Sequence, residues 1–203
     1  MGALWPSVLA GLGIGLPMGW LLSYLGALPF FLGLFFYMIF GLVIGAVMVR
    51  VGQGRGRFEP RRLRLASGLV VGAVWGTALT LEAHGFPRDQ AGRGLERLSA
   101  LPTGTEREQV VEQSREFLTQ HLREHYPPGS AIGYFRWRLT GGRIAMPVAG
   151  LRQMAIEPDR WRWSAQAVIS LLLLTFGVHS QVSGLAVRPG AAAAAAEPAQ
   201  SVT

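Results

Sequence analysis

The chain has 203 residues, of which 50% are hydrophobic, and its mean hydropathy is +0.30. Such a composition is too apolar for an ordinary soluble domain of this size and is typical of a small polytopic membrane protein. The net charge of +7 comes from arginine because the chain has no lysine, and the absence of cysteine excludes disulfides, iron–sulfur clusters and thiolate-ligated zinc. The lack of Lys and Asn beside abundant Gly, Ala and Arg indicates a GC-rich bacterial gene, which favours a bacterial inner membrane.

The segment from Met1 to Val49 contains no Asp, Glu, Lys or Arg. A helix needs about 20 apolar residues to cross a bilayer core, so this segment predicts two spans, at about 4–24 and 30–49. The small-residue turn from Gly26 to Pro29 separates them. The N-terminus carries no basic side chain, which favours a retained span over a cleaved signal peptide.

A third span is predicted at about 65–84, after an arginine-rich loop at 50–64 that holds six arginines against one glutamate. Short loops rich in arginine stay in the cytoplasm. We therefore expect the hairpin turn and residues 85–163 outside, and both termini in the cytoplasm.

Residues 85–163 are long enough for a small folded extracytoplasmic cap. Thr105-Glu106-Arg107-Glu108 fits a capping box and predicts a helix that ends at Tyr126-Pro127-Pro128. The alternation at 135–139 and the stretch 143–146, joined by Gly141-Gly142, predict two paired strands.

The fourth span is predicted at 164–187, with Trp161 and Trp163 as interfacial anchors, and the Ala-rich tail at 188–203 is predicted to be disordered. The predicted fold class is thus an all-α polytopic membrane protein. It has four transmembrane helices, with a small α+β extramembrane cap between the third and fourth. Residues 1–84 hold the first three spans.

Small residues recur four apart in the first three spans, a pattern that lets membrane helices approach closely. We expect these ridges to pack inside the bundle, with an exposed ridge for a membrane-protein partner or a second copy as the alternative. The glycines are Gly11, Gly15, Gly19, Gly41, Gly45, Gly68, Gly72 and Gly76.

The arginines of the 50–64 loop can attract anionic lipid headgroups, although a topology signal alone would give the same pattern. They are Arg50, Arg55, Arg57, Arg61, Arg62 and Arg64. Nucleic-acid binding is not expected, because the cluster lacks interleaved aromatic residues beyond Phe58.

His121-Leu122-Arg123-Glu124-His125 matches the H-x-x-E-H pattern of inverted zinc peptidases. In that interpretation His121 and His125 bind zinc and Glu124 is the general base. The opposing interpretation is a polar, solvated helix face, since a zinc site needs a third protein ligand and a cleft. We expect no cofactor, with zinc as the alternative.

Glu82 and His84 near the outer end of the third span, and His179 in the fourth, are candidates for a proton or ion site. His179 could also ligate haem or a related pigment, but no attachment motif accompanies it. The predicted threading places Glu82 and His84 far from His179, which argues against one continuous pathway.

These patterns name no substrate and contain no common catalytic signature. Our functional prediction is a non-enzymatic accessory or scaffold subunit of a larger membrane assembly. A small transporter or channel component is the first alternative, and a metal-dependent membrane hydrolase that uses the H-x-x-E-H stretch is the second.

Overall fold

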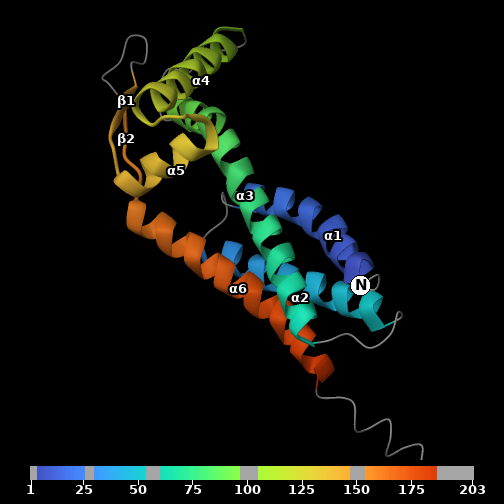
Figure 1. Cartoon of the computed structure of the whole chain (residues 1–203). Helices are drawn as coiled ribbons and strands as arrows, with labels where there is room; N and C mark the ends of the chain where they lie inside the picture. The colour runs from blue at the N-terminus through green and yellow to red at the C-terminus, as the bar shows by residue number, and fades with distance from the viewer. Residues whose placement is uncertain (1–3, 26–29, 54–59, 97–104, 147–153, 187–203) are drawn as a thin grey trace, which may run out of the picture. The chain divides into compact units, whose positions relative to one another are not determined.

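A computed structural model describes residues 4–25, 30–53, 60–96, 105–146 and 154–186 (Figure 1). The elements in chain order are α1 (Leu4–Leu25), α2 (Phe30–Gln53), α3 (Pro60–Glu96), α4 (Thr105–His125), α5 (Ser130–Thr140), β1 (Ile144–Met146), β2 (Met154–Ile156) and α6 (Arg160–Ala186). The chain divides into two compact units, one of residues 1–77 and 169–203 and the other of residues 78–168.

Among the described residues, four helices are long and apolar enough to cross a membrane. The qualifying segments are Trp5–Tyr24, Leu32–Gly52, Arg62–Gly92 and Arg160–Ser183. The predicted all-α class with four membrane helices is therefore confirmed at this level. The predicted turn at 26–29 and the predicted tail at 188–203 lie outside the described residues.

The first unit is a bundle built from α1, α2, the first part of α3 and the second part of α6. Its core is aliphatic, and Ile44, Met48, Val70, Val74 and Leu174 are completely buried. Large apolar side chains also point outward, such as Leu69, Leu172 and Phe176. An apolar outer surface is what a helix bundle needs when its solvent is lipid.

The third helix continues well beyond the predicted end of its span at residue 84. α3 has 37 residues and runs to Glu96, which at 1.5 Å per residue is about 55 Å long. A bilayer core is only about 30 Å thick, so a large part of α3 lies outside it. That part belongs to the second unit and carries Phe86 into its core.

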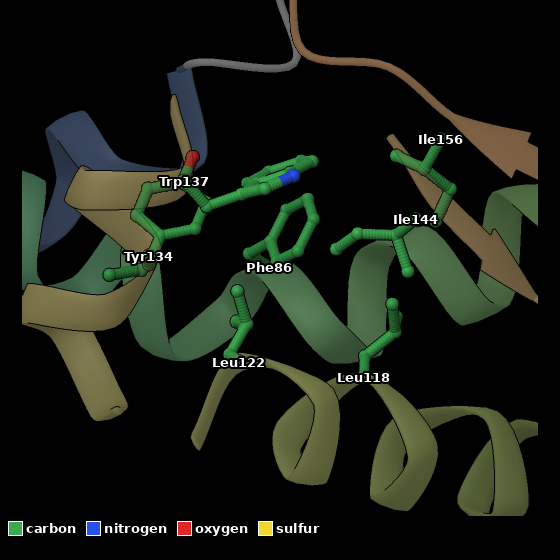
Figure 2. Close-up of a cluster of buried hydrophobic side chains, with 8 residues drawn as sticks. Phe86, Leu118, Leu122, Tyr134, Trp137, Ile144 and Ile156 are labelled. Atoms are coloured by element: carbon green, nitrogen blue, oxygen red, sulfur yellow. The ribbon is translucent and has the colours of Figure 1, made fainter. Parts of the chain in front are cut away.

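The second unit contains α4, α5 and a two-stranded antiparallel ladder in which Ile144 pairs with Ile156. Figure 2 shows Phe86 of α3 among the aromatic side chains of α5 and the leucines of α4. The Phe86 ring lies 4.8 Å from that of Trp137 and 4.9 Å from that of Tyr134, measured between centroids. Side chains from three helices and both strands therefore share one core, whose buried members are Ala83, Phe86, Leu118, Leu122, Tyr134, Trp137, Ile144 and Ile156.

The predicted strand at 135–139 is wrong, because these residues belong to helix α5. The alternating pattern is an accident of a helix that buries Gly133, Tyr134 and Trp137, where Trp137 follows the other two by four and three positions. Gly141 ends the helix in the left-handed conformation at φ 76°, and its N–H donates to the carbonyl of Trp137. The stretch predicted at 143–146 does contain strand β1, but its partner is β2.

Candidate functional site

Glu82 of α3 is the centre of a polar cluster in the second unit. Its Oε1 accepts a hydrogen bond of 2.7 Å from the Tyr134 hydroxyl and one of 3.1 Å from Trp163 Nε1. Arg138 NH2 lies 3.8 Å from the same oxygen. We call these four residues the Glu82 cluster. It joins α3, α5 and the beginning of α6 through one carboxylate.

Arg138 contacts the Tyr134 hydroxyl and three aromatic rings of the core. Its Nε donates to the Tyr134 hydroxyl at 2.8 Å, and its guanidinium carbon lies 5.2 Å from the Tyr134 ring centroid. The corresponding distances to the Phe86 and Trp137 rings are 5.7 and 5.4 Å. Aromatic faces attract a partly desolvated cation, so the rings and the carboxylate fix the same guanidinium.

Tyr134 links the ion pair to the apolar core. Its side chain is fully buried, and its hydroxyl donates to Glu82 while it accepts from Arg138. Burial, followed by the negative charge of Glu82, raises the pKa of Tyr134 well above its ordinary value. The phenol therefore stays protonated near neutral pH and keeps its role as a donor.

The contacts of the Glu82 cluster tie separate elements of the second unit together. Two hydrogen-bond donors and the Arg138 guanidinium converge on one oxygen of Glu82, as in a charge-assisted network that positions elements. The sequence singled out Glu82 but missed Tyr134, Arg138 and Trp163 as its partners. The available signal was the four-residue spacing of Tyr134 and Arg138, which places both on one face of a helix.

The H-x-x-E-H residues all lie on α4. The rings of His121 and His125 stack with their centroids 4.1 Å apart, while Glu124 Oε1 accepts a 2.8 Å hydrogen bond from Gln120. Burial, and then the charge of His125, lowers the pKa of His121. Within the described part of the chain, no group of three or more His, Cys, Asp or Glu residues is placed to hold a metal ion.

The other ionisable candidates of the spans are exposed. His84 Nδ1 lies 2.7 Å from the carbonyl of Thr80, one turn earlier in α3. His179 is an exposed residue of α6 in the first unit. His84 and Glu82 belong to one unit and His179 to the other.

The glycine ridges of α1 and α2 lie against other helices of the first unit. A Cβ built at Gly15 would lie 2.4 Å from Val74 Cγ2, and one built at Gly41 would lie 2.5 Å from the carbonyl oxygen of Leu174. Gly11, Gly19 and Gly45 are similarly tight, whereas a Cβ at Gly68, Gly72 or Gly76 would meet nothing within 4 Å. Among the described residues, the glycine ridge of α3 therefore makes no close contact with another helix, unlike the ridges of α1 and α2.

The arginine loop is described only at its edges. Arg50, at the end of α2, and Arg62 and Arg64, at the beginning of α3, are exposed. Arg55 and Arg57 lie outside the described residues, as does the side chain of Arg61. The candidate lipid site of this loop therefore stays a prediction.

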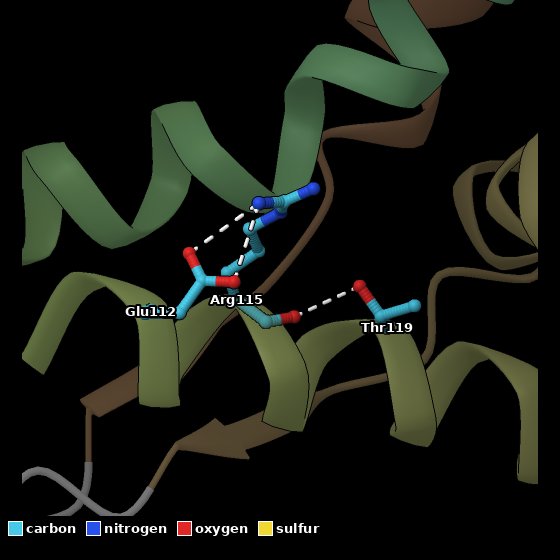
Figure 3. Close-up of polar contacts among 3 residues, drawn as sticks. All are labelled: Glu112, Arg115 and Thr119. Atoms are coloured by element: carbon cyan, nitrogen blue, oxygen red, sulfur yellow. Dashed lines mark hydrogen bonds and ion pairs between the residues drawn. The ribbon is translucent and has the colours of Figure 1, made fainter. Parts of the chain in front are cut away.

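An open pocket of about 510 Å³ lies between α3 and α4, lined by Arg88, Glu108, Val111, Glu112 and Arg115. Figure 3 shows its ion pair, in which Arg115 NH1 lies 3.3 Å from both carboxylate oxygens of Glu112. Both side chains are more than half exposed, so this pair contributes little to stability. Two arginines and two glutamates balance in the lining, which therefore favours no ligand of one charge.

The chain was compared with protein-family models, with curated proteins and with solved structures, and none of these matches it.

Proposed function

We propose that this protein is a non-enzymatic accessory or scaffold subunit of a larger membrane assembly. The observation that carries the proposal is the Glu82 cluster. Glu82, near the end of the third span, accepts two hydrogen bonds and pairs with Arg138, so its charge holds elements of the cap and of α6 together. A group that loads and releases an ion or a proton must instead exchange its partners.

The proposed location is the inner membrane of a bacterium, with both termini in the cytoplasm and the cap outside. The arginine-rich loop at 50–64 supports this orientation through the positive-inside rule. In this orientation, the cap is the part of the protein that a larger partner meets on the outer surface. The spans provide the anchor.

The test is an affinity purification of the full chain from native membranes in mild detergent. We expect a co-purifying membrane protein, and we expect Glu82→Ala to reduce its yield because the cap loses the carboxylate that joins its elements. Glu116→Ala, which removes an exposed carboxylate of α4, is the matched control and should retain the partner.

The alternatives give different results in the same preparations. Ion or proton flux in proteoliposomes that Glu82→Gln abolishes would favour a transporter, and stoichiometric zinc that His121→Ala removes would favour the hydrolase. Purification of the isolated chain alone, together with flux, would contradict the accessory role.

A further inference from the structure

Helix α5 presents an apolar stripe that the core of its own unit does not use. Ile132 and Leu139 are 55% and 58% exposed, and their spacing of seven residues places them on one face of the helix. Arg136, also exposed, lies between them on that face. The other face of the same helix carries Tyr134 and Trp137, which are buried in the core.

The stripe adjoins the beginning of α6. Phe135 of α5 stacks on Trp163 with ring centroids 6.1 Å apart, and Tyr134 meets the same indole edge-on at 6.5 Å. Two residues earlier in α6, Trp161 is 75% exposed between the exposed Arg160 and Arg162. Apolar and basic side chains therefore alternate on the exposed surface of both helices.

The depth of α5 follows from its contacts with two membrane helices. About 20 residues are needed to cross the bilayer core, and that length counted back along α3 from Glu82 reaches Leu63. The same length counted forward along α6 from Trp163 reaches Val182. Glu82 and Trp163 bind each other at 3.1 Å, which puts the corresponding ends of these two lengths at the same level.

We propose that α5 and the first turn of α6 lie in the headgroup layer of the membrane. Ile132, Leu139 and Trp161 enter the acyl-chain boundary while Arg136, Arg160 and Arg162 bind anionic lipid headgroups. Tryptophan and arginine are the residues that such a boundary favours, since each combines an apolar body with a polar tip. Helix α5 contains no acidic residue, and Arg136 is exposed on it, which complements a negatively charged lipid surface.

The experiment uses the full chain, which contains no cysteine, in vesicles of phosphatidylethanolamine and phosphatidylglycerol. Nitroxide labels are placed at Ile132→Cys and Leu139→Cys, and at Gln113→Cys on the exposed face of α4 as the matched control. Collisions with oxygen, which concentrates in lipid, are compared with collisions with a water-soluble nickel chelate. We expect an oxygen-to-nickel ratio at both α5 sites several times that at the control.

Two outcomes would overturn the lipid contact. Nickel accessibility at both α5 sites equal to that at Gln113→Cys would place the stripe in water. Immobile labels that neither reagent reaches would show that protein covers it. Because both α5 positions are exposed, the substitutions leave the core of the cap intact, and the result does not depend on which side of the membrane the cap occupies.

The headgroup part is tested separately with spin-labelled lipids. We expect the combined Arg136→Gln, Arg160→Gln and Arg162→Gln variant to lose selectivity for phosphatidylglycerol over phosphatidylcholine, by about five-fold per arginine at the contacted sites. Arg123→Gln, an exposed arginine of α4, is the control. Unchanged selectivity in the triple variant would overturn the assignment of anionic lipid to these arginines.

Discussion

At the scale of single residues, Glu82 organises the second unit because it is the acceptor for groups from two other helices. Tyr134 is 52 positions away in sequence and Trp163 is 81 positions away. A carboxylate that is 35% exposed would gain little from an ordinary surface ion pair. Its importance comes from the donors that would be left unpaired if it were removed.

Glu82→Ala should therefore destabilise the cap, by about 1–3 kcal/mol, because the buried Tyr134 hydroxyl and the Trp163 indole lose their acceptor. Glu82→Gln should cost less, since an amide oxygen can still accept. Hydrogen exchange of the α5 backbone amides in detergent or vesicles measures the difference. Equal protection of α5 in the wild type and in Glu82→Ala would contradict the role given to this carboxylate.

The raised pKa of Tyr134 predicts a loss of stability at alkaline pH. The unfolded phenol ionises near its ordinary pKa of 10.0, whereas the folded one does so at higher pH. The contribution of the protonated Tyr134 phenol to the stability of the cap is thus fully present below about pH 10, and it is lost as the pH rises above that value. In an alkaline titration followed by tyrosinate absorbance, Tyr134 should ionise in a late step, at a pH above the ordinary tyrosine pKa, and this step should coincide with unfolding of the cap.

Tyr134→Phe is the control for this titration, because it keeps the ring in the core and removes only the hydroxyl. The late step should disappear in this variant. If the step persists unchanged, another tyrosine is responsible for it.

At the scale of elements, spacing alone does not distinguish a covered glycine ridge from an open one. Gly41 and Gly72 occur in the same kind of four-residue pattern, yet a Cβ at Gly41 would meet the backbone of α6 and one at Gly72 would meet open space. The difference arises from how each helix is rotated in the bundle. Rotation is set by the packing of all the helices together.

Gly41→Ala should accordingly destabilise the bundle, by about 1–3 kcal/mol, because the new methyl group must push the backbone of α2 away from α6. Gly72→Ala should be neutral or slightly stabilising, since alanine is the better helix former. Thermal unfolding in detergent, followed by size-exclusion chromatography, compares the two. Equal losses in both variants would contradict the assignment of covered and open ridges.

Helix α5 illustrates a second ambiguity at this scale. Alternating apolar and basic residues at 135–139 match a strand, but α5 as a whole buries Tyr134 and Trp137 about one helical turn apart. Both patterns are present in the sequence. Packing on Phe86 and the hydrogen bonds of the Glu82 cluster stabilise the helical form.

At the scale of the whole molecule, the proposed orientation gives a direct labelling prediction. Gln113→Cys in α4 should react with a membrane-impermeant maleimide in intact spheroplasts. Arg50→Cys at the end of α2 should react only after the membrane is permeabilised, because positively charged loops stay in the cytoplasm. The reverse pattern would show that the cap is cytoplasmic.

The sequence by itself determined that this protein has four helices suited to a membrane, because apolar length is a local property that needs no knowledge of the fold. It also pointed to Glu82 as an unusual charge at the end of a span. Only the tertiary structure decided which donors bind Glu82, which glycines are covered, and that α5 is a helix. These features depend on contacts between residues far apart in the chain, and such contacts exist only once the helices have packed.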